Sequence, residues 1–267
     1  MEKPTRLTPS LREKVWGRKR LSPWYPDAET AIGEAWFLSP RELPLLVKWI
    51  FTNERLSVQV HPDDGEDGSR GKTEMWHILE AEPGATIAMG FREPITRERL
   101  REATRTGAVE QLLHWAPVKP GETYFIPAHT VHAIGAGIVL CEIQQNSDVT
   151  YRLWDYGRPR EIHVEKAIPI CNLGVHPGAS QGGALGDGRE EVVRSRHFIT
   201  ELVRLEDGEQ RVPEAHRCQL WICIEGGGRI GAEEFQAGEV WLLPETGVQP
   251  EIAAQGPARF LRTWVPD

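Results

Sequence analysis

Short alternating apolar runs, each ended by proline or glycine, restrict the fold of this chain more than any other feature. In "LSVQVHPDD", Leu56, Val58 and Val60 are apolar at every second position, which is the period of a strand with one buried face. Pro62 and Gly65 then end the run. Similar runs follow along most of the chain, and 26 glycines and 20 prolines among 267 residues supply turns between them. The pattern predicts a mainly β protein built from many short strands.

Two segments depart from this β rhythm. "TRERLREATRTGAVEQLLHW" places Leu100 and Val109 on an apolar face, and Thr96 is suited to cap its first turn. It therefore predicts one or two short amphipathic helices inserted among the strands. "TPSLREKVW" near the N-terminus also predicts a short helix, with Thr8 or Ser10 as the cap.

A glycine-rich polar stretch, "NLGVHPGASQGGALGDGRE", predicts a linker over residues 172–190. It divides the chain into a first domain, 1–171, which carries an N-terminal extension and the helical insertion, and a second β domain, 191–267. Two β units joined by a linker resemble a bicupin, in which two jelly-roll barrels lie in one chain.

Charge and cysteine usage exclude several classes of partner. The net charge of −8, without a block of basic residues, argues against nucleic acid but leaves room for a small anionic substrate. The N-terminus lacks the apolar core of a signal peptide, and the longest apolar stretch, "LPLLVKWIF", is interrupted by Lys48 and is too short to cross a bilayer. Without CxxC spacing, the cysteines are expected to be reduced thiols of a cytoplasmic protein. They are Cys141, Cys171, Cys218 and Cys223.

Two histidines and a glutamate lie where strands meet turns. Alternation puts Ser57, Gln59 and His61 on one strand face, Glu74 follows thirteen residues later, and His132 lies in a third strand-turn setting. Imidazole nitrogens with a carboxylate and an amide oxygen form a plausible ligand set for a divalent cation. Because an uncompensated glutamate is rarely buried, we expect these groups to form a metal site.

Four stretches in order, "LSVQVHPDD", "KTEMWHILEA", "IPAHTVHAIGAG" and "EIQQNSDVTYRLWDYGR", resemble the short bacterial form of phosphomannose isomerase (mannose-6-phosphate isomerase), a zinc-dependent cupin family. The resemblance spans roughly residues 10–168, and the C-terminal part is similar only in pattern to the family's metal-free second barrel. It implies interconversion of mannose 6-phosphate and fructose 6-phosphate with one zinc ion per chain. The oligomeric state is not predicted.

The resemblance also implies roles for individual residues. The metal ligands that it implies are Gln59, His61, Glu74 and His132. Arg152 corresponds to the catalytic arginine and Lys72 to a lysine beside the substrate. Because a guanidinium keeps its proton, we expect Arg152 to stabilise negative charge on the oxygen of a cis-enediol. Lys72 and Glu142 both remain candidates for the general base.

The phosphate-binding residues implied by the resemblance are Ser57, Lys48 and Arg158. Lys48 interrupts an apolar strand, which is costly unless its ammonium is paired or bound. The alternative for Lys48 is a side chain that extends outward to water.

Histidines outside the metal set have plainer interpretations. His129 stands where the family usually has glycine, which predicts a positive φ at this turn. Its imidazole either points to solvent or lies over the pocket mouth as a titrating group. His163 has no companion residues and is expected at the surface. Glu34 either reaches the site or forms a structural hydrogen bond, and we expect the hydrogen bond.

Two other classes of function share parts of this pattern. Two histidines and a carboxylate also form the facial triad of non-haem iron oxygenases. Such an oxygenase needs no phosphate cluster, so Lys48, Arg152 and Arg158 argue against it. A non-catalytic sugar-binding cupin would keep the barrel, since fold alone does not prove activity. The joint presence of the metal set, Lys72 and Arg152 argues against that alternative.

Overall fold

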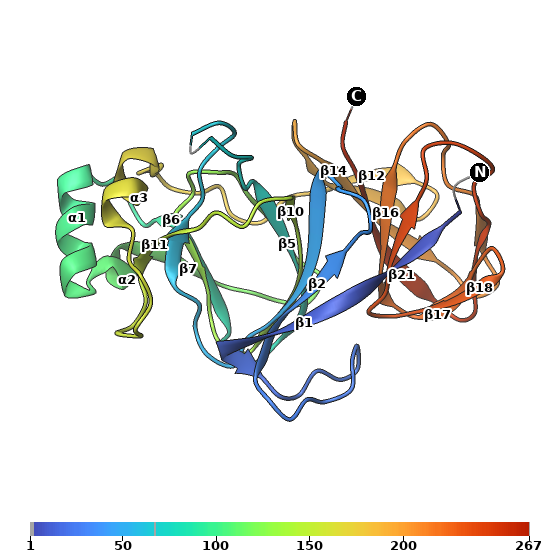
Figure 1. Ribbon diagram of the computed structural model, residues 1–267, viewed down its shortest axis with the longest axis horizontal. Helices are drawn as coiled ribbons and strands as arrows, with labels where there is room; N and C mark the ends of the chain where they lie inside the picture. Colours follow the sequence, from blue (N-terminus) through green and yellow to red (C-terminus); the bar gives the residue numbers. More distant parts are fainter. Residues whose placement is uncertain (1–2, 67, 267) are drawn as a thin grey trace.

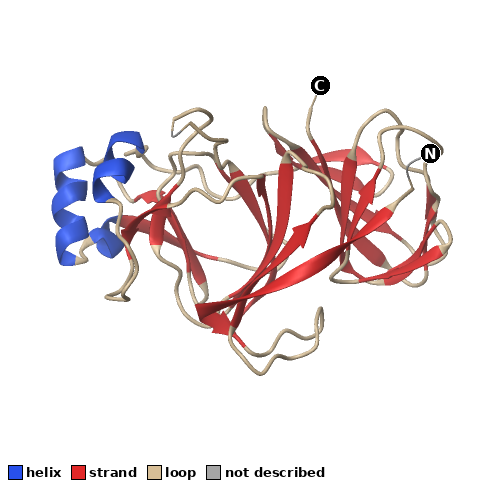
Figure 2. Cartoon of the chain, viewed as in Figure 1, coloured by secondary structure: helices blue, strands red, loops and turns tan. Residues whose placement is uncertain are grey.

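The computed structural model describes residues 3–66 and 68–266, in which two β-rich halves lie side by side and the helices gather at one end (Figures 1 and 2). The elements of the first half are β1 (Thr5–Arg18), β2 (Ile32–Leu38), β3 (Leu45–Phe51), β4 (Val58–Val60), β5 (Glu74–Ala81), β6 (Thr86–Phe91), α1 (Arg97–Thr106), α2 (Val109–Leu112), β7 (Leu113–Pro117), β8 (Thr123–Ile126), β9 (His132–Ile134), β10 (Ile138–Gln145), β11 (Tyr151–Trp154) and α3 (Val164–Ile170). Those of the second half are β12 (Gly183–Gly186), β13 (Arg189–Arg194), β14 (Ile199–Leu205), β15 (Gln210–Arg211), β16 (Gln219–Glu225), β17 (Gly227–Ile230), β18 (Glu233–Gln236), β19 (Val240–Leu243), β20 (Ile252–Ala254) and β21 (Ala258–Trp264).

One twelve-stranded sheet runs through both halves, in the order β12-β13-β14-β21-β16-β19-β1-β2-β3-β10-β5-β8. The strand that joins the halves is β1, which pairs with β19 over Thr5–Leu7 and with β2 from Thr8 onward. The helix predicted at "TPSLREKVW" is therefore wrong. Pairing with β2 over Thr8–Glu13 gives this segment ladder hydrogen bonds, and such tertiary pairing outweighs local capping preference.

A second sheet completes the first half, with five strands in the order β11-β4-β9-β6-β7. Its inner face and the β5–β10 part of the large sheet enclose a core that includes Trp76, Met89 and Leu140. Its other face packs against the helices, since Leu100 of α1 shares a buried cluster with Val58 of β4. This arrangement places β4, β5, β9 and β11 around one interior space.

The predicted helical insertion is confirmed. Thr96 caps α1 by accepting a hydrogen bond from Arg99 N, and Gly107 ends the helix in the left-handed conformation at φ 78°. The sequence did not predict α3, which contains Pro169. In the described part of the chain, no helix has the length and apolar character needed to span a membrane.

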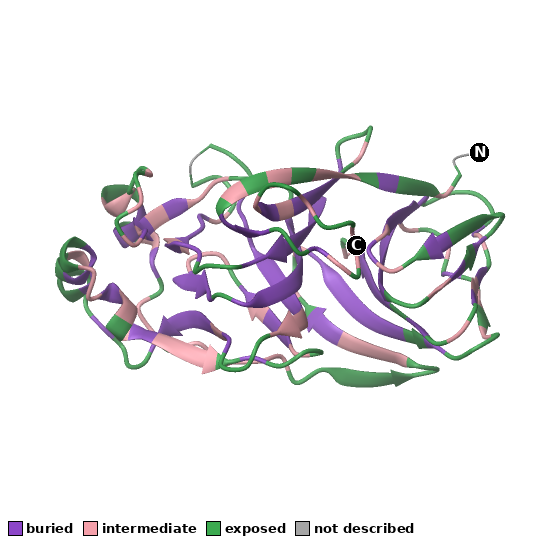
Figure 3. Ribbon diagram, turned by 90° about the horizontal axis from the view of Figure 1, so that it is seen from below, coloured by how far each residue is buried: buried purple, intermediate pink, exposed green. Residues whose placement is uncertain are grey.

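The second half pairs the other end of the large sheet with a four-stranded sheet, β15-β20-β17-β18, around a core that includes Trp221, Phe235 and Phe260. The predicted linker contains β12 and the first residues of β13. Buried residues such as Trp49 and Leu220 form one cluster that joins the two halves. Figure 3 shows buried positions concentrated on the strands and exposed ones on the helices and outer loops.

The predicted mainly β fold, with two cupin-type barrels and a short helical insertion, is confirmed. The domain boundaries at 171 and 191 stay a prediction.

Candidate functional site

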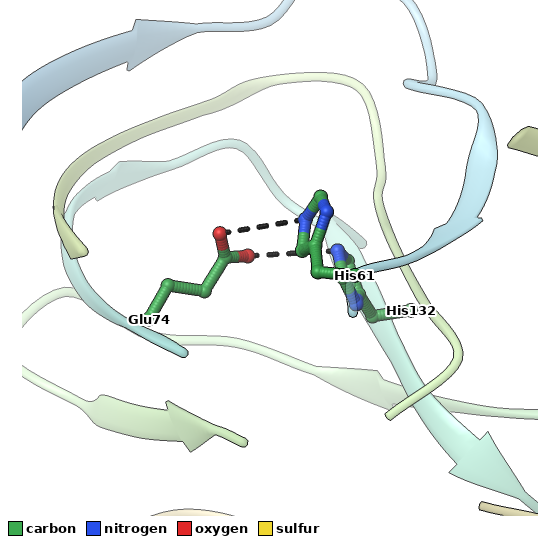
Figure 4. A group of neighbouring side chains, drawn as sticks. All are labelled: His61, Glu74 and His132. Atoms are coloured by element: carbon green, nitrogen blue, oxygen red, sulfur yellow. Dashed lines mark ion pairs between the residues drawn. The ribbon is translucent and has the colours of Figure 1, made fainter. Parts of the chain in front are cut away.

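Three predicted metal ligands converge between the two sheets of the first half (Figure 4). His61 follows β4, Glu74 begins β5 and His132 begins β9. Glu74 Oε2 lies 3.5 Å from His61 Nε2, and Glu74 Oε1 lies 3.5 Å from His132 Nε2. One donor atom from each residue lies within 4.8 Å of the others. The fold thus gathers donors that are up to 71 residues apart in sequence (61 to 132).

Backbone carbonyls orient both imidazoles toward the glutamate. His61 Nδ1 lies 2.9 Å from Val149 O, and His132 Nδ1 lies 2.8 Å from Thr130 O. A carbonyl only accepts, so each Nδ1 carries the hydrogen and each Nε2 keeps its lone pair. Burial lowers the pKa of His132 to about 3. It also lowers the pKa of His61 well below its usual value, with a further contribution from Lys72. Both rings are therefore neutral and can each offer the Nε2 lone pair to a metal ion.

Glu74 is a buried carboxylate whose charge is not fully compensated. Burial, and then Glu142, raise the pKa of Glu74 to about 7 against the opposing effect of Lys72. Glu74 Oε1 is buried without a hydrogen-bond partner. Lys72 Nζ lies 2.6 Å from Glu74 Oε2 and 3.0 Å from His61 Nε2. Two neutral nitrogens and a carboxylate with an unused oxygen fit a divalent cation of the zinc type.

Gln59 lies beside this group on β4. Its Nε2 is 3.3 Å from His132 Nε2, and its Oε1 accepts a hydrogen bond of 3.1 Å from Ser57 Oγ. A half-turn of the amide exchanges its nitrogen and oxygen at almost the same positions. Gln59 is therefore placed where its oxygen can face the three donors.

A cavity of about 270 Å³ lies next to the metal set, which it meets through Gln59 and Lys72, whereas His61, Glu74 and His132 do not line it. The predicted site residues that line it are Lys48, Ser57, Gln59, Lys72, Glu142 and Arg152. Its remaining walls include Lys14 and Glu34, which form an ion pair of 2.9 Å, and Glu34 also accepts from Trp36 Nε1. The expected hydrogen bond of Glu34 is present, whereas Lys14 was not predicted from the sequence to lie at the site.

Lys48 is paired and does not extend to water. Its Nζ lies 3.2 Å from Glu142 Oε1 and 4.2 Å from the centre of the Trp36 ring. Burial raises the pKa of Glu142, but Lys72 and Lys48 outweigh it and bring the value to about 2. The pKa of Lys72 shifts in the other direction. Burial lowers it, but Glu74 and Glu142 outweigh burial and raise the pKa.

Arg152 lies on β11, opposite Gln59 of β4. Its Nη1 donates to Glu161 O at 2.8 Å, and its Nε is buried without a partner. Among the described carboxylates, none forms an ion pair with Arg152. The guanidinium is thus held on one side and retains unused donors.

Arg158 is not among the residues that line the cavity. Its guanidinium binds Glu54 at 2.8 Å, Asp155 at 3.3 Å and the carbonyl of Arg55 at 2.9 Å. Arg160 lines the cavity in its place, and two hydrogen bonds of 2.6 Å tie it to the buried Asp155.

His163, expected at the surface, is half-buried and lines the cavity. Its Nδ1 accepts a hydrogen bond of 3.1 Å from Arg152 N. The residues over 160–163 lack alternation or a recognisable spacing to the metal set. Only the concentration of arginines after Asp148 could have indicated this wall.

His129 adopts the predicted positive φ, 72°. Its Nε2 lies 2.7 Å from Glu66 Oε2, and its backbone N–H donates to His61 O at 2.8 Å. It does not line the cavity. The side chain is therefore paired beside the turn that follows His61.

The chain is similar in sequence and in fold to several mannose-6-phosphate isomerases. No family model matches the chain. Mannose-6-phosphate isomerase of Streptococcus mutans is 32% identical in an alignment of 297 positions, which covers 92% of this chain and 94% of the relative. Mannose-6-phosphate isomerase ManA of Bacillus subtilis is 33% identical, and the alignment covers 90% of this chain and 93% of the relative. The crystal structure of the mannose 6-phosphate isomerase from Bacillus subtilis superposes with a TM-score of 0.86 at 25% identity, covering 98% and 99% of the two chains. A zinc-bound mannose 6-phosphate isomerase shares the fold with a TM-score of 0.78 at 17% identity, covering 99% and 100%. The chain belongs to the mannose-6-phosphate isomerase family.

Proposed function

We propose that the protein is a zinc-dependent isomerase that interconverts mannose 6-phosphate and fructose 6-phosphate. The observation that carries this proposal is the buried, undercompensated Glu74 beside two neutral imidazoles. Lys72, which contacts Glu74 and His61, lines a cavity that also holds other cationic side chains. The names of the relatives supply the sugar phosphate, and the zinc-bound structural neighbour supports the choice of metal.

His61, Glu74 and His132 would hold the zinc ion, with Gln59 as the fourth protein ligand. When bound, zinc supplies a positive charge that stabilises developing negative charge on a substrate oxygen. The fixed Nδ1–H bonds of both histidines keep Nε2 aimed at that position.

The chain's own residues account for the remaining chemistry. Moving the carbonyl between C1 and C2 requires removal of a proton beside it, through a cis-enediol with negative charge on oxygen. Arg152 keeps its proton and lines the cavity, and its Nη2, which binds none of the described residues, would stabilise that charge. Lys72 and Glu142 line the same cavity and are the two candidates for carrying the proton between the carbons.

The substrate phosphate is assigned to Ser57, Lys48 and Arg160. All three line the cavity, and Arg160 takes the role expected of Arg158 because Arg158 lies outside the lining. Asp155 uses Nε and Nη2 of Arg160, which leaves Nη1 for a charge-assisted bond to phosphate oxygen.

A coupled isomerase assay on mannose 6-phosphate tests the proposal. Chelator treatment should abolish turnover, and stoichiometric zinc should restore it without oxygen uptake. Absence of turnover in protein shown by elemental analysis to be zinc-loaded would contradict the proposal. Tight binding of the sugar phosphate without turnover would instead favour the binding protein, and oxygen uptake with iron would favour the oxygenase.

A further inference from the structure

The strand that carries Arg152 is an edge strand. The five-stranded sheet begins with β11, so among the described strands β4 is its one neighbour, and none of them lies beside the outward backbone groups of β11. At Arg152 this edge is closed by one residue. Arg152 N donates to His163 Nδ1 at 3.1 Å, and Arg152 O accepts from His163 N at 2.7 Å. His163 therefore replaces a neighbouring strand at this position.

The same short segment fixes the arginine side chain. Arg152 Nη1 donates to Glu161 O at 2.8 Å, so backbone N, backbone O and Nη1 of Arg152 are all bound by residues 161–163. Arg152 Nε is buried without a partner, and Arg152 and His163 both line the cavity. Nη2 of Arg152 binds none of the described residues and is the guanidinium nitrogen left for a ligand in the cavity.

Both ends of this segment are anchored. Arg160 is tied to the buried Asp155 by two hydrogen bonds of 2.6 Å. At the other end, His163 O accepts from Ala167 N at 2.9 Å in the first turn of α3. A displacement of the His163 ring is therefore resisted from two directions, which suits a rigid support.

We propose that His163 is a positioning residue for Arg152, acting through the hydrogen bond that its Nδ1 accepts from the Arg152 backbone. The proposal rests on the role given to Arg152 in the proposed function. The ring serves as an acceptor and transfers no proton. An asparagine oxygen can occupy the place of Nδ1, whereas the amide of glutamine extends beyond it to the place of Nε2.

The experiment compares His163→Asn with His163→Gln in the zinc-loaded enzyme. Both variants carry an uncharged amide, so differences in fold and charge are small. His163→Asn should keep kcat within about 3-fold of the parent. His163→Gln should lower kcat by on the order of 10-fold or more, with a smaller change in KM and unchanged zinc content, because misplacement of a catalytic group costs rate. Equal kcat values in the two variants would overturn the proposal.

A double-mutant cycle separates this inference from the proposed function. Arg152→Gln alone should slow turnover strongly, and adding His163→Gln to it should cost less than about 2-fold further, because both act through the same guanidinium. A normal rate in Arg152→Gln would refute the role of Arg152 itself. A slow Arg152→Gln together with a fully additive effect of His163→Gln would refute the positioning role alone.

Discussion

Glu74 and Glu142 are buried carboxylates on the neighbouring strands β5 and β10, yet their surroundings shift their pKa values in opposite directions. Burial raises the pKa of Glu74 to about 7, whereas two lysines outweigh burial and lower that of Glu142 to about 2. Glu142 is compensated by the protein itself. Glu74 retains an unused oxygen and lacks full compensation, which is the electrostatic argument for a cation at this place.

The ion pair between Lys48 and Glu142 gives a prediction about stability. Lys48→Met keeps the length of the side chain but leaves Glu142 buried without its nearest cation, 3.2 Å away. Removing one partner of a buried pair typically costs about 3–5 kcal/mol, and the free energy of unfolding should fall by no more than that amount, because Lys72 and the Trp76 Nε1–H still face Glu142. Urea unfolding measures it, with Lys119→Met, at an exposed position, as the control. A loss below about 1 kcal/mol would show that Glu142 is stabilised without Lys48.

Among the elements, β11 has a second support in addition to His163. Trp154, near the end of β11, packs against the left-handed turn at Gly107 that ends α1. A Cβ at Gly107 would lie 2.7 Å from the Trp154 ring, so this turn and the arginine-bearing strand are in direct contact.

This contact predicts that Gly107→Ala is more harmful than an ordinary turn substitution. Gly84→Ala is the matched control, because Gly84 has φ 84° but no atom within 4 Å of the added Cβ. Both variants should lose about 1–2 kcal/mol for the left-handed backbone. Gly107→Ala should lose about 1–3 kcal/mol more from the clash. Equal losses in urea unfolding would mean that Trp154 moves aside without cost.

The elements also show which parts of the site could be predicted from the sequence. The alternation in "LSVQVHPDD" correctly predicted a strand that holds Gln59, with Ser57 just before β4 and His61 just after it, because strand alternation is a local property. The helix expected at Thr8 proved to be β1, because its partner strands lie far away in sequence.

The cavity walls depended on the same long-range pairing. Lys14 reaches the cavity on β1, and His163 reaches it beside the edge of β11. Neither residue stands in a local pattern that indicates the neighbour it meets. The metal set could be predicted because each ligand lies in a recognisable strand-turn motif of its own.

At the scale of the whole molecule, the two halves are not independent barrels. They share the large sheet through β1 and one buried cluster. His77, on β5, lies near this junction, and burial, with the guanidiniums of Arg259 and Arg204 from the second half, lowers its pKa to about 4. Its Nδ1 lies 2.9 Å from Thr123 Oγ1.

This histidine predicts a pH dependence of stability. Because the pKa of His77 in the folded protein lies below the unfolded value of about 6.5, the unfolded chain binds more protons between these values. Its neutral form therefore contributes stability above pH 6.5 that is lost as the pH falls toward 4, on the order of 3 kcal/mol in total. His77→Gln should flatten the unfolding free energy between pH 6.5 and 4 relative to the parent, whereas His216→Gln at an exposed position should not. Identical pH profiles of His77→Gln and the parent would contradict this.

The assignment of the metal centre is tested by measuring two quantities in the same samples, zinc per chain and mannose 6-phosphate turnover. The samples are the parent, Glu74→Gln and Glu80→Gln. Glu80 lies on the same strand and pairs with Arg18, so its variant controls for loss of a carboxylate on β5. With Glu74 as a zinc ligand, we expect one zinc ion per chain and full turnover in the parent and in Glu80→Gln. In Glu74→Gln we expect a loss of zinc affinity of about 100-fold or more and a parallel loss of turnover, because a charged ligand is removed. Full zinc content and turnover in Glu74→Gln would contradict the assignment of the metal centre.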